Sequence, residues 1–89
     1  MTEEEADLIE PLLRPGVDRL GMWVLYDHPL DFPNLYVARY HHIEPGRSVP
    51  GPAFGNVNLT VLRAILADAG RVKLMRSNDD DPAILETWI

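Results

Sequence analysis

The fold is decided by the stretch NLTVLRAILADAG, residues 58–70. Leucine, isoleucine and alanine recur in it every three or four residues, which is the spacing of one apolar face of a helix. Asn58 is a favoured N-cap residue, and Gly70 stands where a left-handed C-cap is expected. The stretch therefore predicts a helix from residue 58 to residue 69 whose apolar stripe packs on another layer of structure.

Two segments before this helix have the composition of strands. Residues 22–26 are apolar, aromatic or β-branched, and residues 35–43 form a second such run. The loop between them holds two prolines and two turn-forming residues, so the two strands are expected to form a wide antiparallel hairpin. Residues 44–55 are half proline and glycine, which predicts no regular structure before the helix.

Two further segments after the helix complete the sheet. Residues 71–76 alternate polar and apolar side chains, which predicts a half-buried strand with Val72 and Leu74 facing inward. Residues 77–82 form a turn, and residues 83–89 are the last strand. The order ββαββ predicts an α+β fold, a two-layer sandwich in which one main helix packs on a four-stranded antiparallel sheet.

The beginning of the chain is expected to be an acidic extension, residues 1–21, placed before a single domain at residues 22–89. Its apolar residues recur at helical spacing from Glu3 to Leu13, with Thr2 as the N-cap. Pro11 removes a hydrogen bond and clashes with the preceding turn, so the short helix is expected to end or bend near Glu10.

Composition excludes several classes of protein. A chain of 89 residues with 46 % hydrophobic and 25 % charged residues is expected to fold around one modest core. The chain contains no cysteine, which excludes disulfides, thiolate zinc sites and a cysteine nucleophile. No apolar run is long enough to span a membrane and the first residues are acidic, so a cytoplasmic location without a membrane partner is expected.

The charge of the chain is unevenly distributed along it. The net charge is −6, with both ends acidic and the middle mildly basic. Binding to nucleic acid requires a concentrated basic face, and acidic groups nearby oppose it. A nucleic-acid partner is therefore disfavoured.

One loop contains residues suited to acid–base chemistry. Asp27 and Asp31 flank His28, which is a set that could form a proton-transferring pair or a metal site. His41 and His42 lie on the second predicted strand, whose far end is expected near residues 21–22 and away from that loop. The three histidines are therefore not expected to converge, and the sequence predicts no metal site.

The acidic run at residues 79–81 is the other candidate cation site. A calcium loop of the EF-hand type requires glycine at its sixth position, where this chain has Ile84. The run is therefore expected to be a solvated turn. The glycines at 46, 51 and 55 alternate with prolines that lack backbone N–H groups, so no phosphate-binding loop and no cofactor are predicted.

Two stretches, WVLYDHPLDFP at residues 23–33 and DDDPAILETWI at residues 79–89, carry a resemblance. The chain resembles a family of short, uncharacterised bacterial and prophage-associated proteins over residues 22–89. The family has no established activity, so the resemblance implies no catalytic residue. It implies a phage-related or accessory role.

The leading functional expectation is a non-enzymatic module that binds another protein or a second copy of itself. The free backbone groups of an edge strand invite pairing with another chain, which would give a homodimer. The expected surface is the exposed face and edge of the sheet. Its candidate residues are Arg39, Tyr40, His42, Arg71, Lys73 and Arg76.

Two alternatives belong to other classes. The acidic ends could imitate nucleic-acid phosphates and occupy a basic groove of a host protein, which requires both ends to lie on one face. The chain could instead be a small hydrolase or metal-dependent enzyme built on Asp27, His28 and Asp31, which requires those residues to line a pocket.

Overall fold

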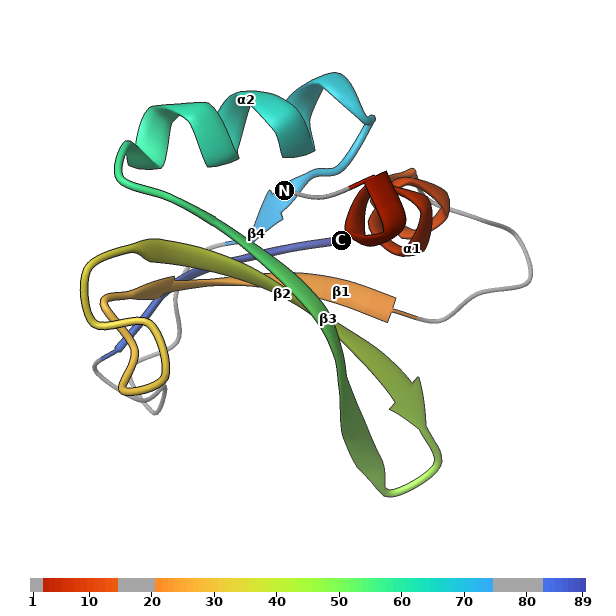
Figure 1. Cartoon of the computed structure of the whole chain (residues 1–89). Coiled ribbons are helices and arrows are strands. Elements are labelled where there is room, and N and C mark those ends of the chain that lie inside the picture. The colour runs from red at the N-terminus through yellow and green to blue at the C-terminus, as the bar shows by residue number, and fades with distance from the viewer. Residues whose placement is uncertain (1–2, 15–20, 75–82) are drawn as a thin grey trace.

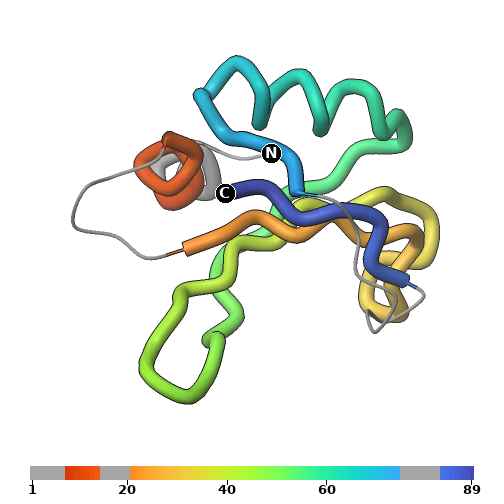
Figure 2. Tube along the Cα trace, turned by 180° about the vertical axis from the view of Figure 1, so that it is seen from behind, coloured from red at the N-terminus to blue at the C-terminus, as the bar shows by residue number. Residues whose placement is uncertain are grey.

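The computed structural model describes residues 3–14, 21–74 and 83–89, and within them it shows an α+β fold. The helices are α1, Glu3–Leu13, and α2, Leu59–Asp68. The strands are β1, Gly21–Asp27; β2, Tyr36–Glu44; β3, Arg47–Asn56; β4, Lys73–Leu74; and β5, Ile84–Trp88. They form one antiparallel sheet in the order β3-β2-β1-β5-β4, and both helices lie on the same side of it (Figures 1 and 2). The predicted α+β class is confirmed, with five strands in place of four.

Helix α2 confirms the prediction made from the stretch 58–70. The side chain of Asn58 caps the helix by accepting a hydrogen bond from the backbone N–H of Thr60 at 2.9 Å. Gly70 follows the helix in the left-handed region, at φ 90°. Leu62 and Leu66 are fully buried, so the apolar stripe of α2 forms its contact with the sheet.

Strand β3 corrects the expectation that residues 44–55 are irregular. Pro45 and Gly46 form the tight turn between β2 and β3, and Gly46 supplies the positive φ of 80° that such a turn requires. Pro50 and Pro52 are tolerated in β3 because it is an edge strand, so one side of its backbone needs no donor. The resulting hairpin projects away from the body of the protein (Figure 1).

Strand β4 is shorter than predicted and faces the opposite way. Residues 75–76 of the predicted strand lie outside the described part of the chain, and β4 spans Lys73–Leu74. Val72 and Leu74 are 61 % and 40 % exposed, so the expectation that they face inward is wrong. Leu74 pairs with Thr87, whose neighbour Trp88 belongs to the core. Because side chains alternate along a strand, those of Thr87 and Leu74 lie on the side of the sheet away from the helices.

Helix α1 is part of the same core as the sheet. It continues through Pro11 to Leu13, so of the two predicted outcomes an end near Glu10 is wrong, and a bend there stays a prediction. Ile9 is buried with Trp23, Leu62 and other members of the core cluster. The domain boundary at residue 22 stays a prediction, but α1 docks on the domain and does not hang free.

Arg71 ties the end of α1 to the sheet. Its buried guanidinium donates hydrogen bonds of 2.7 Å to the backbone oxygens of both Leu12 and Leu13, and longer ones to those of Arg14 and Gly21. The last carbonyls of a helix lack partners within the helix, and a cation there also opposes the negative end of its dipole. Arg71 therefore acts as the C-terminal cap of α1, although it lies far away in the sequence.

An ion pair between the partly exposed Arg63 and the buried Glu86 links α2 to β5. The carboxylate of Glu86 accepts two hydrogen bonds from Arg63 of α2, at 2.9 and 3.1 Å, and a third from the indole N–H of Trp88 at 3.1 Å. These donors hold the pKa of Glu86 below its usual value, although burial alone would raise it. The pair satisfies the one carboxylate that the described sheet buries beneath a helix.

Candidate functional site

The side of the sheet turned away from both helices carries a pocket. We call this side the outer face and define it by Val24 and Tyr26 of β1, Arg39 and His41 of β2, and Thr87 of β5. These residues alternate with buried core residues along their strands, so their side chains point away from the helices. The pocket has a volume of about 380 Å³, which is within the range of small-ligand sites. Its lining residues are Tyr26, Pro29, Asp31, Val37, Arg39, His41 and Pro50.

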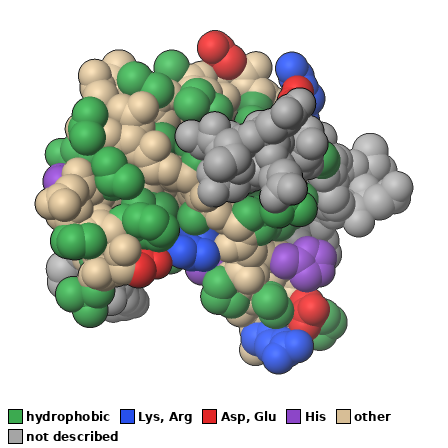
Figure 3. Space-filling view, viewed as in Figure 1, with side chains coloured by type: hydrophobic (Ala, Val, Ile, Leu, Met, Phe, Trp, Pro, Cys, Tyr) green, Lys and Arg blue, Asp and Glu red, His purple; other side chains and the backbone are tan. Residues whose placement is uncertain are grey.

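The pocket is bounded by two projecting parts of the chain. Pro29 and Asp31 come from the loop between β1 and β2, and Pro50 comes from β3. The space-filling view shows a hollow between this loop and the β2–β3 hairpin, with hydrophobic side chains gathered over the loop (Figure 3). His28 starts the loop in the left-handed region, at φ 48°, and its ring packs edge-on against Tyr36. After His28, the loop brings Pro29 and Asp31 to the pocket.

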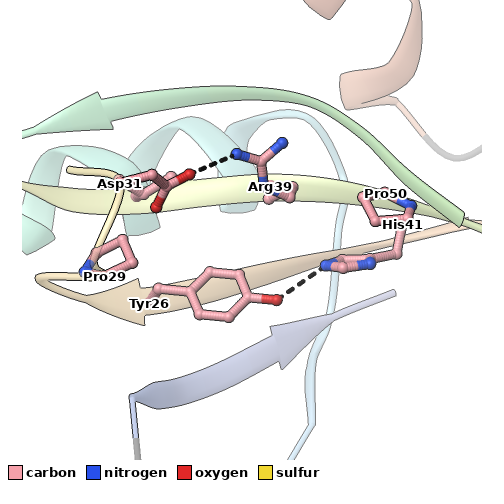
Figure 4. A pocket seen from close by; sticks show the side chains of 7 residues that line it. Tyr26, Pro29, Asp31, Arg39, His41 and Pro50 are labelled. Carbon is pink, nitrogen blue, oxygen red and sulfur yellow. Dashed lines mark hydrogen bonds and ion pairs between the residues drawn. The ribbon is translucent and has the colours of Figure 1, made fainter. Parts of the chain in front are cut away.

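Arg39 is the cation of the pocket and is held in a fixed orientation. Its guanidinium donates one hydrogen bond of 2.9 Å to the backbone oxygen of Gly51. It donates another of 3.1 Å to Asp31 (Figure 4). The register of β2 and β3 shifts between Arg39 and His41, which is where the strand carrying Gly51 bulges. Gly51 lies at this irregularity, and its backbone oxygen accepts the bond from Arg39.

Tyr26 and His41 form a second polar pair in the pocket. The phenol oxygen of Tyr26 lies 2.9 Å from Nε2 of His41 (Figure 4). Burial lowers the pKa of His41, and the positive charge of Arg39 lowers it further. Nδ1 of His41 is buried and finds no hydrogen-bond partner among the described residues. His41 is therefore expected to be neutral at pH 7.

The residues predicted to form one binding surface do not lie together. Arg39 lies on the outer face, whereas His42, the second residue along from Tyr40, alternates onto the side that bears the helices. Tyr40 is buried in the core and Arg71 is buried against α1, so neither is part of an exposed surface. Lys73 is exposed on the edge strand β4 opposite the buried Trp88, and Arg76 lies outside the described residues.

The loop proposed for acid–base chemistry is also divided. Asp31 lines the pocket and pairs with Arg39, whereas Asp27 and His28 pair with each other at exposed positions outside the pocket lining. Within the described ranges, no group of three or more histidine, aspartate and glutamate residues is placed to hold a metal ion. The arrangement therefore gives the Asp27, His28 and Asp31 set no common site.

The acidic residues on which the nucleic-acid-mimic alternative depends lie almost entirely outside what the structure describes. Residues 79–81 and 15–20 are not described, and of the acids in α1 only Glu10 has a described side chain, which is exposed. The clustering of the two acidic ends on one face stays a prediction.

A second hollow lies between the two helices. Its volume is about 260 Å³, and Arg14 shares its lining with Glu10 and Asp68. Two acids outnumber the one arginine in this lining, so it does not favour an anionic ligand. The outer-face pocket is both larger and better defined in its hydrogen bonding, so it is the stronger candidate.

Sequence reasoning missed five of the residues that build the outer-face pocket: Tyr26, Pro29, Val37, His41 and Pro50. The signal was present in β2, because Val37, Arg39 and His41 are spaced two residues apart and must share one face of a strand. The predicted surface combined Arg39 with Tyr40 and His42, which alternate onto the other face. Pro50 could not be assigned, because its segment was expected to be irregular.

Among the described residues, neither helix is long and apolar enough to cross a membrane. Comparison of the chain with protein-family models, with curated proteins and with solved structures finds no match.

Proposed function

We propose that the chain is a small protein-binding module that acts through its outer face. The observation that supports this is the exposure of apolar side chains on the side of the sheet that α1 and α2 leave uncovered. Ile43 lies on this side beyond the pocket, and Val72, Leu74 and Ile89 gather on it at the β4 edge. Val72, Leu74 and Ile89 are neighbours at this edge, and a contiguous group of exposed apolar side chains is typical of an interaction surface.

The face is a better candidate for the contact than the strand edges. Pairing of edge strands would give the homodimer that the sequence also suggested. At one edge, β3 carries Pro50 and Pro52, which cannot donate to an added strand. At the other edge, β4 has two described residues, one of them Lys73, and short charged edges discourage pairing. The proposal therefore places the partner against the outer face.

The test compares two exposed leucines with the same substitution. Leu74→Asp puts a charge on the outer face, whereas Leu8→Asp puts it on an exposed position of α1 on the helical side. Affinity capture from the host lysate is run with the unaltered chain and with both variants, after circular dichroism shows that each variant is folded. We expect a specific partner that Leu74→Asp loses and Leu8→Asp retains.

Two results would contradict the proposal. Loss of the partner in Leu8→Asp with retention in Leu74→Asp would move the interface to the helices. A chain that captures nothing, and that sediments as a strict monomer at high concentration, would remove both a partner and self-association. A concentration-dependent dimer that Leu74→Asp dissociates would identify the partner as a second copy of the chain.

A further inference from the structure

We infer that the outer-face pocket is a binding site for a carboxylate attached to an apolar group. The inference begins with Arg39, whose guanidinium is the cation among the described pocket residues. A planar guanidinium matches the two oxygens of a carboxylate and can bind them through two parallel hydrogen bonds. The bond from Arg39 to the Gly51 carbonyl fixes the plane of the guanidinium before any ligand arrives.

Asp31 occupies the position that such a ligand would take. Its carboxylate accepts one hydrogen bond of 3.1 Å from Arg39, and its side chain is 58 % exposed. Ion pairs this exposed contribute little to stability, because water screens them and the flexible side chains lose entropy. A ligand carboxylate can therefore displace the side chain of Asp31 from Arg39 at a small cost in free energy.

The charge of the site favours a carboxylate over a phosphate. A phosphate carries up to two negative charges at pH 7 and usually requires several donors or cations. This pocket offers one arginine beside one aspartate, and the single histidine in its lining is expected to be neutral. One negative charge is the charge that Arg39 can neutralise.

The other lining residues determine which chemical group next to the carboxylate the pocket can accommodate. Val37, Pro29 and Pro50 present apolar surface around the guanidinium, and the ring of Tyr26 continues it. The paired Tyr26 and His41 mark the polar end of this wall. A small aromatic or branched aliphatic group next to the carboxylate fits this combination. Both the carboxyl terminus of a peptide and a free organic acid have this chemistry.

The inference rests on the proposed function only for the idea that the carboxylate belongs to a protein partner. The experiment therefore uses small probes and no partner. The full chain, labelled with ¹⁵N, is titrated with phenylacetate and, separately, with phenylacetamide, which has the same shape without the charge. Both are taken into the millimolar range, where ligands of this size bind. We expect phenylacetate alone to shift the Nε–H signal of Arg39 and the amide signals of Tyr26, His41 and Gly51.

Two variants of the same loop sharpen the test. Asp31→Asn removes the tethered carboxylate and is expected to bind phenylacetate about 2- to 5-fold more tightly, the range set by an exposed ion pair. Asp27→Asn is the matched control, because Asp27 is exposed and pairs with His28 and not with Arg39. It is expected to bind as the unaltered chain does. Arg39→Gln is expected to lose the response to phenylacetate, with a dispersed spectrum showing that it is folded.

The inference is overturned if phenylacetate and phenylacetamide give the same shifts, or if Asp31→Asn binds no more tightly than Asp27→Asn. If phenylacetate binds as expected, a short peptide ending in phenylalanine is compared with its carboxyl-terminal amide to identify the source of the natural carboxylate. Binding of the peptide acid supports a partner's carboxyl terminus, and failure of the peptide where phenylacetate binds supports a free acid. If probe binding fails while a captured partner depends on Leu74, the protein-binding proposal stands alone.

Discussion

Replacing Arg71 by methionine is expected to destabilise the protein by about 3 kcal/mol. The substitution keeps an apolar side chain of similar length but removes all guanidinium bonds to the end of α1. Two of these bonds are short, at 2.7 Å, and a bond from a charged donor contributes about 1.5 kcal/mol or more. The bonds to Arg14 and Gly21, at 3.4 and 3.3 Å, are long and add little. The oxygen of Leu12 keeps the indole N–H of Trp23, which limits the loss.

The loss is measured by urea and thermal unfolding followed by circular dichroism. For a domain of this length, about 3 kcal/mol corresponds to a fall in Tm of about 15 °C. The Tm of Arg71→Lys is expected to lie between those of the unaltered chain and Arg71→Met, because an ammonium group cannot reach several carbonyls in one plane. Hydrogen exchange of the α1 amides is expected to rise in Arg71→Met before that of the sheet.

The matched control is Arg47→Met, at the tip of the β2–β3 hairpin. Arg47 is 71 % exposed and makes one ion pair with Glu44, so its loss is expected to change stability by less than about 0.5 kcal/mol. If Arg71→Met unfolds within about 1 kcal/mol of the unaltered chain, or no lower than Arg47→Met, the capping role assigned to Arg71 is refuted.

Three further predictions concern the core and the pocket. Because the pKa of Glu86 is lower in the folded chain, its contribution to stability is present above about pH 4.5 and is lost as the pH falls. Glu86→Gln is therefore expected to flatten the decline of the urea midpoint between pH 7 and 3. A methyl group at Gly21 would lie 1.8 Å from the Tyr40 oxygen, so Gly21→Ala is expected to destabilise the chain by about 1–3 kcal/mol in the same assay. An unchanged midpoint would contradict that packing. His41 is expected to titrate below pH 6.5 by NMR, so stability falls as the pH drops below 6.5; Arg39→Gln is expected to raise its pKa.

The sequence predicted those elements whose determining residues lie close together along the chain. The helix at Leu59–Asp68 is defined by its apolar spacing, its Asn58 cap and Gly70, which are all close in sequence. The alternation at residues 71–74 was recognised, but alternation says that two side chains share a face and not which face is covered. Pairing of Leu74 with Thr87 decides that, and it depends on β5.

The errors arose where the deciding contact is distant in sequence. Proline-rich composition argued against a strand at β3, yet Pro50 is acceptable there because β3 is at the edge, a fact of sheet order. Arg71 was expected on the surface as most arginines are, and its burial depends on α1, more than fifty residues away. The pocket likewise required the loop after β1 and the bulge in β3 to meet over β2.

The position of β1 in the sheet has a consequence for synthesis. It lies between β2 and β5, and it contains Trp23, Val24 and Leu25, all buried. As the chain leaves the ribosome, β1, β2 and β3 can pair as successive hairpins, while the other side of β1 has no neighbour until β5 emerges. During that interval the most apolar strand of the sheet is an open edge, the kind of surface through which nascent chains aggregate. We therefore expect ribosome-bound chains that stop before residue 83 to require a chaperone, and folding to be completed only after translation of β5.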